Sequence, residues 1–437
     1  MQRLVLWLYG LLLRLATPLL RRKLRRRAAA EPGYALAVEE RFGHYTQPAD
    51  AGCVWIHAVS LGETRAAAIL LAQLRAQLPG LRLLLTHGTA TGRAEGTRLL
   101  QHGDVQVWQP WDTPRAVRRF LQHFRPAIGI LMETEVWPCL VDGCRKQGVP
   151  LVLANARLNA KSRDGALRLA WLARPAYAGL AAIWAQTEGD AERLRQVGAH
   201  SDSVRVLGNL KFDVRPNATL LAQGRAWRAE LARPVLLLAS SREGEEAMWL
   251  QYFKQNMASG QCGKEQTAIN NDAAAPQWLI VPRHPQRFDE VAALCQAAGL
   301  SVARRSQWDG VPPAADVWLG DTLGEMALYY GLADVALLGG SFAPLGGQNL
   351  IEAAACGCPI VLGPHTFNFA EAAELALQSG AAQRAASLAE GASLACALAR
   401  DAARHRAMQA SCQHFAQAHI GAARAMAQAL QALLARQ

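Results

Sequence analysis

The sequence predicts an α/β protein in which parallel sheets are covered by helices on both faces. From Gly52 onward, short apolar runs without helical spacing alternate with longer amphipathic segments, which is the pattern of repeated strand and helix units. This alternation restarts at Val235, which indicates a second domain of the same kind. The stretch from Asp334 to Gly363 contains a whole unit: an apolar strand, a glycine-rich loop, a helix, a turn and a second strand.

The N-terminus predicts a membrane-associated helix. Leu4 to Leu20 is an apolar run interrupted by Arg14, and six of the seven residues from Arg21 to Arg27 are basic. The run is marginal for a span, which needs about 20 apolar residues, and its charge follows the apolar run, whereas a signal peptide carries it before. This order favours a helix in or on the membrane, with the basic cluster against anionic headgroups. The alternative is a buried first helix followed by a solvated basic turn.

The positive charge of the chain is concentrated at this end. The net charge is +11, but residues 1–27 hold eight Lys or Arg and no acid, which leaves +3 for the rest. A nucleic-acid-binding body is disfavoured because its basic residues would be spread over a face or groove. The nine cysteines lack CxxC spacing, so buried free thiols in a reducing compartment are expected rather than disulfides or zinc.

The first domain is expected to alternate strands and helices, with one helix at 62–78. The expected strands are Val54–Val59, Leu81–Thr86, Val105–Trp108, Ala127–Met132, Leu151–Ala154, Ala182–Gln186 and Val204–Leu207. Ligands of such sheets bind at the carboxyl ends of the strands. The polar residues that follow each strand are therefore the site candidates.

The second domain follows a linker and an amphipathic helix within 214–233. Its expected elements are the strands Val235–Ala239, Leu279–Val281, Val317–Leu319 and Ala333–Leu338 and the helix Leu350–Cys356. Thr322, in GDTLGEM, is expected to cap the helix after it. Ser259 to Pro276 has neither period and is expected to be a flexible surface insertion. Beyond Phe369 the chain is Ala-rich and is expected to be helical, with 401–437 packing across the domain junction.

Glu63 is the first catalytic candidate. It lies in the first turn of the helix after the first strand, in HAVSLGET. A carboxylate there faces any cleft above the sheet and suits a general base that takes a proton from an attacking hydroxyl. A glutamate that only stabilises its own helix fits this position equally well. The loop from Thr86 to Gly92 has the same two interpretations: contact with polar ligand groups, or ordinary capping.

Two acidic and two cationic residues follow later strands. Glu133 and Glu135 come directly after Met132, and their mutual repulsion must be offset by a cation or used by the chemistry. Lys211, in GNLKFD, and Arg157 are the candidate cations. Each alone is more often a surface charge, whereas together they indicate a polar cleft.

The second domain offers a candidate anion site. Gly339-Gly340 ends a strand, and Gly346-Gly347 precedes Asn349, which is expected to cap the next helix. Such glycines let backbone N–H groups face a phosphate, and the helix N-terminus adds partial positive charge. Simple tight turns explain the glycines equally well. Glu352 is one turn into the helix, within reach of sugar hydroxyls, and Arg283 follows another strand of the domain.

Six motifs in order carry a resemblance to a known family. They are HAVSLGE, METEVWP, GNLKFD, PRHP, GDTLGEM and GGS…GGQN..E, behind the basic N-terminal segment. This set is similar to that of the 3-deoxy-D-manno-oct-2-ulosonic acid (Kdo) transferases of lipopolysaccharide assembly and covers nearly the whole chain. The resemblance implies the GT-B architecture of two facing Rossmann-like domains. It also implies inverting transfer of Kdo from CMP-Kdo to the lipid A precursor lipid IVA at the cytoplasmic face of the inner membrane.

The resemblance divides the chain into four parts. They are a membrane anchor with the basic cluster (1–27), an acceptor domain (28–216), a CMP-Kdo-binding domain (217–400) and C-terminal helices (401–437). The expected partners are CMP-Kdo, the lipid A precursor and an anionic membrane surface, without nucleic acid. Neither a cofactor nor a metal is expected, because no DxD-type pair follows a strand. The alternatives are a nucleotide-sugar 2-epimerase of the same architecture and a non-catalytic membrane-bound nucleotide-binding protein.

The resemblance also implies residue roles. Glu63 matches the general base, and Glu133 and Lys211 match residues thought to stabilise the transition state. The positions that match the CMP site are Pro282, Arg283, Leu323, Gly324, Glu325, Asn349, Leu350, Ile351 and Glu352. Gln348 stands where the family commonly has histidine, and glutamine donates a hydrogen bond but cannot become cationic.

Overall fold

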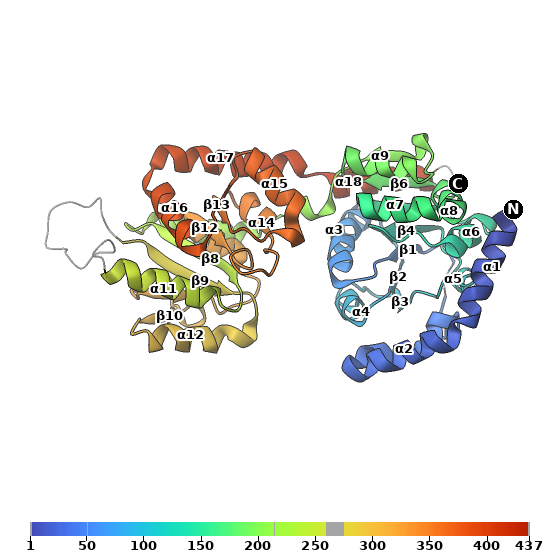
Figure 1. Ribbon diagram of the computed structural model, residues 1–437, viewed down its shortest axis with the longest axis horizontal. Helices are drawn as coiled ribbons and strands as arrows, with labels where there is room; N and C mark the ends of the chain where they lie inside the picture. The colour runs from blue at the N-terminus through green and yellow to red at the C-terminus, as the bar shows by residue number, and fades with distance from the viewer. Residues whose placement is uncertain (1, 50, 214, 259–274, 436–437) are drawn as a thin grey trace. The chain divides into compact units, whose positions relative to one another are not determined.

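The computed structural model describes residues 2–49, 51–213, 215–258 and 275–435. It divides into two compact units: unit 1 comprises Met1–Asp213 and Gly421–Gln437, and unit 2 comprises Val214–Ile420. Each unit holds a seven-stranded parallel sheet with helices on both faces (Figure 1). The predicted α/β class with two parallel-sheet domains is confirmed.

The sheet of unit 1 is doubly wound. Its strands are β1 (Val54–His57), β2 (Leu83–His87), β3 (Val105–Trp108), β4 (Ile128–Met132), β5 (Leu151–Ala156), β6 (Ala182–Ala185) and β7 (Val204–Val206), close to the predicted ranges. Their order across the sheet is β3-β2-β1-β4-β5-β6-β7, so the winding reverses between β1 and β4. Ligands bind outside the carboxyl ends of the strands at such a reversal, which puts the residues after β1 and β4 at the expected site.

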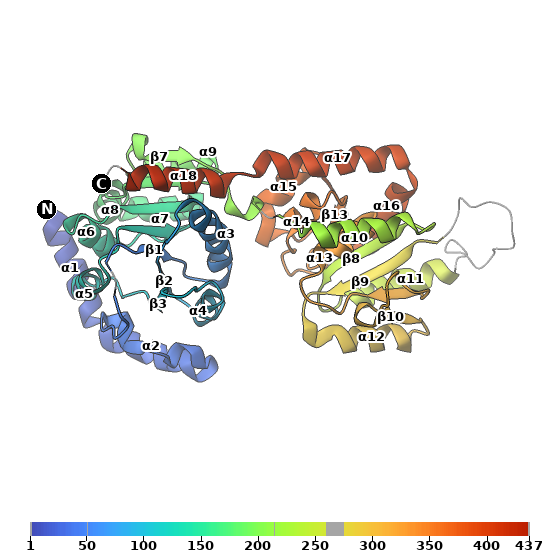
Figure 2. The same ribbon diagram turned by 180° about the vertical axis from the view of Figure 1, so that it is seen from behind.

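Helices cover both faces of this sheet. They are α3 (Leu61–Gln77), α4 (Ala90–Thr97), α5 (Pro114–Phe124), α6 (Pro138–Lys146), α7 (Ala160–Arg168), α8 (Ala170–Ala178), α9 (Glu188–Gln196) and α18 (Ala422–Leu434), with the 3₁₀ turns η3 (Ser201–Ser203) and η4 (Leu210–Phe212). Side chains alternate along β1, so Trp55 faces α5, α6, α8 and α9, whereas Ile56 faces α3 and α18. Both side chains are fully buried. Figure 2 shows α18 beside α3, which it contacts.

Unit 2 repeats the architecture. Its strands are β8 (Val235–Ser241), β9 (Gln277–Pro282), β10 (Val302–Arg304), β11 (Val317–Leu319), β12 (Val335–Leu338), β13 (Ile360–Leu362) and β14 (Ala382–Arg384), in the order β10-β11-β9-β8-β12-β13-β14. Its helices are α10 (Ala218–Ala229), α11 (Glu245–Ala258), α12 (Phe288–Ala297), α13 (Met326–Leu332), α14 (Leu350–Ala355), α15 (Ala370–Gln378), α16 (Leu388–Arg400) and α17 (Ala402–His419), with η6 (Pro285–Arg287), η7 (Arg305–Gln307) and η8 (Phe367–Phe369). The winding reverses between β8 and β12.

Two edge strands of unit 2 were not predicted. β10 and β14 are short and have little apolar periodicity, and each is a strand because it pairs with a neighbour, β11 or β13. The prediction of continuous helix beyond Phe369 is therefore wrong at β14. The insertion predicted at 259–276 lies almost wholly outside the described residues.

The chain returns to unit 1 near its end. α17 packs on α14 in unit 2, and α18 packs on α3 in unit 1. Asp213 holds the start of α18, because its carboxylate accepts the N–H groups of Gly421 and Ala423. Gly421 has φ +115°, a conformation open to glycine.

The N-terminal segment forms two helices, where the sequence predicted one. α1 (Gln2–Leu15) and α2 (Thr17–Ala30) meet at a bend of 50° and are followed by η1 (Pro32–Ala35) and η2 (Val38–Phe42). Pro18, in the first turn of α2, lacks the N–H that would continue the ladder from α1. Among the described residues, no single helix meets the length and hydropathy of a bilayer span; α1 and α2 meet them only as a bent pair.

Candidate functional site

In unit 1, Glu63 sits at the N-terminus of α3, directly after β1. Its backbone N–H donates to Ser60 Oγ at 3.4 Å, Ser60 Oγ donates to Glu63 Oε1 at 2.9 Å, and the Val59 N–H donates to Glu63 Oε2 at 2.9 Å. This resembles a capping box, with the carboxylate bonded to the N–H of Val59, the residue before the N-cap Ser60, so Glu63 does stabilise its own helix. The two donors also orient the carboxylate, which can accept further hydrogen bonds through its remaining lone pairs.

Burial raises the pKa of Glu63 above its ordinary value, and repulsion from Glu133 adds to this effect. A carboxylate with a raised pKa is a stronger base and is better matched to proton transfer near neutral pH. Glu63 therefore combines a fixed orientation with the basicity that a general base requires.

Glu133 follows β4 and is paired with two cations. Its side chain is 4% exposed, Arg157 Nε donates to its Oε2 at 2.6 Å, and Lys211 Nζ lies 3.8 Å from its Oε1. Glu133 has φ +56°, a conformation that costs free energy for a residue other than glycine and is frequent at functional sites. The structure thus brings together Glu133, which follows β4, and the cations Arg157 and Lys211, which follow β5 and β7.

The sequence reasoning gave no role to Asn155, which positions Lys211. Asn155 is fully buried, and its Oδ1 accepts the Leu210 N–H at 3.0 Å. This bond holds η4, the turn that carries Lys211. Asn155 also has φ +53° at the end of β5, and asparagine tolerates that conformation better than most residues. The sequence feature that could have indicated this role is an asparagine directly after the predicted strand Leu151–Ala154.

Glu135 is a third acid of the cluster. Its Oε2 accepts the indole N–H of Trp137 at 2.8 Å. Burial raises the pKa of Glu135 to about 7, with further contributions from the charges of Glu63 and then Glu133. The three carboxylates therefore interact electrostatically, although Glu135 itself has no ion pair within the described ranges.

We expect Glu135 to reduce stability as the pH rises from about 4.5 to 7. Its pKa is higher in the folded protein, so the folded state binds more protons and the free energy of unfolding falls through this window. Glu135→Gln should therefore be more stable than the wild type at about pH 8, by on the order of 3 kcal/mol, with the difference shrinking toward about pH 4. Chemical unfolding across this range measures it; a difference independent of pH would contradict the assignment.

The polar groups of the loop after β2 form hydrogen bonds with other residues of unit 1. Thr89 Oγ1 accepts the Gly92 N–H at the start of α4 and donates to the Val59 carbonyl at 2.8 Å. Arg41 is 4% exposed, lies 3.9 Å above the ring of Trp108, and donates to the Gly88 carbonyl at 3.0 Å. Of the two interpretations of this loop, the structure therefore provides contacts for the capping one.

In unit 2, the candidate nucleotide residues follow neighbouring strands. Pro282 ends β9, the loop with Leu323, Gly324 and Glu325 follows β11, and Asn349 begins α14 after β12. These strands are parallel, so their carboxyl ends lie at one edge of the sheet. β8 runs between β9 and β12, which brings its end residues, Ser241 and Arg242, into this row.

The first glycine pair is occupied by the protein itself, which favours the tight-turn interpretation of these glycines over phosphate binding by their N–H groups. The fully buried Glu245 of α11 accepts the N–H groups of Gly340 at 2.7 Å, Phe342 at 3.0 Å and Ala343 at 3.2 Å. These donors are already paired with a carboxylate. Glu245 thus fixes the loop beside α14 and leaves ligand contacts to other groups.

The residues around α14 connect two predicted loops. Asn349 caps α14, since its Oδ1 accepts the Ile351 N–H at 3.1 Å. Leu350 and Ile351 are buried, so their contribution to a ligand is through the backbone. Burial raises the pKa of Glu352, while the charge of Arg283 opposes this. Glu352, in the first turn of α14, and Arg283, in the loop after β9, therefore act on each other.

The loop after β11 carries one strongly exposed apolar side chain. Leu323 is 74% exposed, and Gly324 has φ +81°. Glu325 pairs with Arg305 at 2.9 Å. Thr322 does not cap α13, which begins at Met326; its hydroxyl instead hydrogen-bonds Glu325 and Tyr329. The capping prediction for Thr322 is wrong because its side chain turns into this network.

Gln348 and Arg242 both approach the glycine loop at Gly340. A Cβ placed at Gly340 would be 3.1 Å from Gln348 Nε2 and 3.5 Å from Arg242 Cγ. The position that the resemblance assigns to histidine thus has glutamine here, and its amide lies against the glycine loop.

Cysteines and other possible metal ligands also occur among the described residues. None of the eight cysteines within the described ranges forms a disulfide, and all except Cys396 are buried, as predicted. In the same part of the chain, no group of three or more His, Cys, Asp or Glu side chains is placed to hold a metal ion.

The fold and the two clusters define a class of protein: two doubly wound α/β domains of the kind found in GT-B glycosyltransferases and nucleotide-sugar epimerases. Solved structures agree on the fold. The UDP-GlcNAc 2-epimerase of Neisseria meningitidis is 13% identical over 86% of this chain and 99% of its own, with a TM-score of 0.52. A glycosyltransferase of Rickettsia africae is 12% identical over 88% and 98%, with a TM-score of 0.51.

The chain belongs to the 3-deoxy-D-manno-octulosonic acid (Kdo) transferase family. The family model described as "3-Deoxy-D-manno-octulosonic-acid transferase (kdotransferase)" matches residues 37–214. The Kdo transferase of Bordetella pertussis is 48% identical over 435 residues, which cover 97% of this chain and 98% of the relative. That of Haemophilus influenzae is 32% identical over 349 residues, or 78% of each chain. The family predicted from the motifs is confirmed.

Proposed function

We propose that this Kdo transferase moves Kdo from CMP-Kdo to a hydroxyl of a lipid A precursor, lipid IVA, with inversion at the anomeric carbon. The observation that carries the proposal is the 48% identity to a Kdo transferase over nearly the whole chain. The acid and base cluster at the winding reversal of unit 1, where an α/β sheet binds its ligand, supports it independently.

Glu63 is the proposed general base. The acceptor hydroxyl loses its proton to the Glu63 carboxylate as its oxygen attacks C2 of Kdo, and the bond from C2 to the CMP phosphate breaks. The capping bonds from Val59 and Ser60 keep the carboxylate in one orientation during the transfer. Arg157 and Lys211, held by Glu133, supply positive charge for the anionic groups of the reacting sugar.

The proposed CMP site is the row of loops in unit 2. Arg283 is the cation that meets the leaving phosphate, and Glu352 beside it is available to the ribose hydroxyls. Glu245 contributes by fixing the glycine loop. This assigns the nucleotide to Pro282, Arg283, Leu323 to Glu325 and Asn349 to Glu352, and binding of CMP to an Arg283→Gln variant is a direct check.

Mass spectrometry of products tests the function. Purified protein, CMP-Kdo and tetraacylated lipid A precursor should yield the precursor with Kdo attached and free CMP. CMP release that is independent of the lipid acceptor would favour an epimerase-like enzyme. Binding of CMP-Kdo without any turnover would favour a non-catalytic nucleotide-binding protein.

The transfer is proposed to be independent of metal. Arg283, Arg157 and Lys211 are fixed cations that can balance the charge of the phosphate and the sugar acid. The initial rate after exhaustive chelation is therefore expected to equal the untreated rate. A rate that is lost on chelation and restored by a divalent cation would contradict this.

We also propose that the protein acts at the cytoplasmic face of the inner membrane, held there by α2. Basic residues near an anionic surface contribute ~1 kcal/mol each, so Arg22→Gln, Lys23→Gln and Arg26→Gln together should weaken binding to anionic vesicles about 100-fold. These side chains are exposed, so the fold is retained. Activity on lipid acceptors should fall more than activity on a water-soluble analogue, and equal losses would contradict the proposal.

A further inference from the structure

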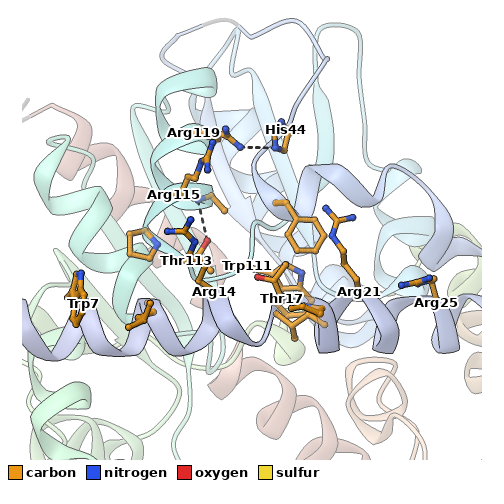
Figure 3. Close-up of a pocket in the computed structure, with 17 residues that line it drawn as sticks. Trp7, Arg14, Thr17, Arg21, Arg25, His44, Trp111, Thr113, Arg115 and Arg119 are labelled. Carbon is orange, nitrogen blue, oxygen red and sulfur yellow. Dashed lines mark hydrogen bonds between the residues drawn. The ribbon is translucent and has the colours of Figure 1, made fainter.

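A groove lies in unit 1 between the N-terminal helices and the body of the domain. α1 and α2 form one wall, and η2 with the start of α5 forms the other (Figure 3). The groove encloses about 790 Å³, within the range of sites that bind small molecules.

The walls of the groove are apolar. Trp7 and Leu11 of α1 face Pro114 of α5, and Phe42 and Trp111 continue the apolar surface. α1 runs close to α5 because Gly10 has no side chain; a Cβ there would be 2.8 Å from the Pro114 ring. The groove is therefore a fixed feature of the docked helix, suited to hydrocarbon.

The groove is also strongly basic. Arg14, Arg21, Arg25, Arg115 and Arg119 line it, and no acidic residue does. Figure 3 shows these arginines on both walls, from α1, α2 and α5. An apolar groove with a basic rim is complementary to an anionic amphiphile.

Two of the five arginines are held by neighbours, and three have no counter-charge. Arg21 binds Glu39 through two hydrogen bonds, of 2.6 and 2.9 Å, and Arg119 lies 2.7 Å from His44 Nε2. Arg14, Arg25 and Arg115 form no ion pair with the described residues of the chain. Like charges gathered around one groove repel each other, and an anion placed among them relieves that repulsion.

The groove begins at the carboxyl-terminal end of the sheet, where the catalytic candidates also lie. Trp111 and Thr113 follow β3, and the carboxyl end of β3 is at the same edge as those of β1 and β4, which precede Glu63 and Glu133. Beyond the groove, α1 and α2 present Leu8, Leu12, Leu15 and Leu19, all more than half exposed. Apolar surface thus continues from the groove along the N-terminal helices.

We propose that this groove binds the acceptor itself: its arginines hold a phosphate on the acylated sugar, and its apolar walls take the adjoining part of an acyl chain. The inference rests on the proposed function and adds to it the groups by which the acceptor is recognised. The occupant is the phosphorylated glycolipid acceptor, as distinct from bulk anionic phospholipid, because the arginines line an apolar groove that begins at the same end of the sheet as the catalytic candidates.

The test compares two double variants with the same change in charge. Arg14→Gln with Arg115→Gln removes two unpaired arginines of the groove, whereas Arg118→Gln with Arg195→Gln removes two exposed arginines of α5 and α9 that do not line it. All four side chains are exposed, so both proteins should fold. Two quantities are measured: equilibrium binding of radiolabelled lipid A precursor in neutral detergent micelles, and KM and kcat for transfer.

The groove variant should bind the phosphorylated acceptor at least about 10-fold more weakly, with KM raised in proportion and kcat nearly unchanged. The control variant should match the wild type. An acceptor without phosphate should bind the wild type and the groove variant equally. Equal losses in the two variants, or full competition by vesicles of anionic phospholipid, would overturn the proposal. The binding measurement does not depend on turnover, so a wild type that binds the acceptor through these arginines but transfers nothing would refute the function and not the groove.

Discussion

Glu63→Gln is expected to lower kcat for Kdo transfer at least ~100-fold while leaving the Kd for CMP-Kdo unchanged. Glutamine keeps the size of the side chain and one acceptor oxygen for the capping bonds, but it cannot take the proton of the acceptor hydroxyl. The raised pKa of Glu63 adds a pH signature. In the wild type, kcat/KM should fall as the pH drops through that pKa, because the base becomes protonated. The variant should lose this limb of the profile.

The chain contains a matched control for the capping role of Glu63. Glu390 lies in the first turn of α16 and has two of the three bonds of Glu63: its N–H donates to Ser387 Oγ at 3.2 Å, and its Oε2 accepts the Ala386 N–H at 2.7 Å. Glu390 is exposed and belongs to none of the candidate clusters. Glu390→Gln should therefore lose the same capping charge without losing activity. Near-normal turnover in Glu63→Gln, or an equal loss in both variants, would remove Glu63 from the role of base.

Glu133→Gln is expected to lower kcat by about 100- to 1,000-fold, the range seen when a fixed electrostatic group is removed. The carboxylate orients Arg157 and Lys211 through contacts of 2.6 and 3.8 Å. The free energy of unfolding should change by less than about 2 kcal/mol, because the two cations are 56% and 39% exposed and can be hydrated when the acid is gone. A large loss of rate with a small loss of stability is thus the signature of a catalytic role.

A double-mutant cycle with Lys211→Met shows whether the pair acts as a unit. If it does, Glu133→Gln combined with Lys211→Met should be little slower than either single variant. Initial rates and unfolding curves should be measured on the same preparations. Fully additive losses, or a loss of stability that accounts for the loss of rate, would contradict the assignment.

The sequence predicted where Glu63 lies in its helix but not which charged residues surround it. Its place at the start of the helix after β1 followed from the apolar pattern, and both interpretations of it were local. The structure shows the capping bonds and also the neighbours, Glu133 and Glu135, that act on its charge. Those neighbours follow a different strand, so the sequence pattern around Glu63 does not predict how close they lie to it.

In the glycine loop of unit 2, the motif suggested a ligand contact where the fold instead makes an internal one. Two glycine pairs between a strand and a helix are typical of a phosphate loop, and the motif alone gave no sign that Gly340, Phe342 and Ala343 donate to Glu245. Glu245 is about 95 residues away in sequence. Buried N–H groups must find acceptors, and which acceptor they find depends on how α11 packs.

The sequence by itself determined the α/β class, the interior strands of both sheets, the basic N-terminus and the family, because apolar periodicity, charge clusters and short motifs are local properties of a chain. Tertiary structure decided which edge strands pair, where the N-terminal segment bends and packs, that the predicted cations Arg157 and Lys211 both pair with Glu133, and that Glu245 occupies the glycine loop. Each of these depends on groups brought together from distant segments by burial, and their hydrogen bonds and charges are satisfied only once the sheets and helices have packed.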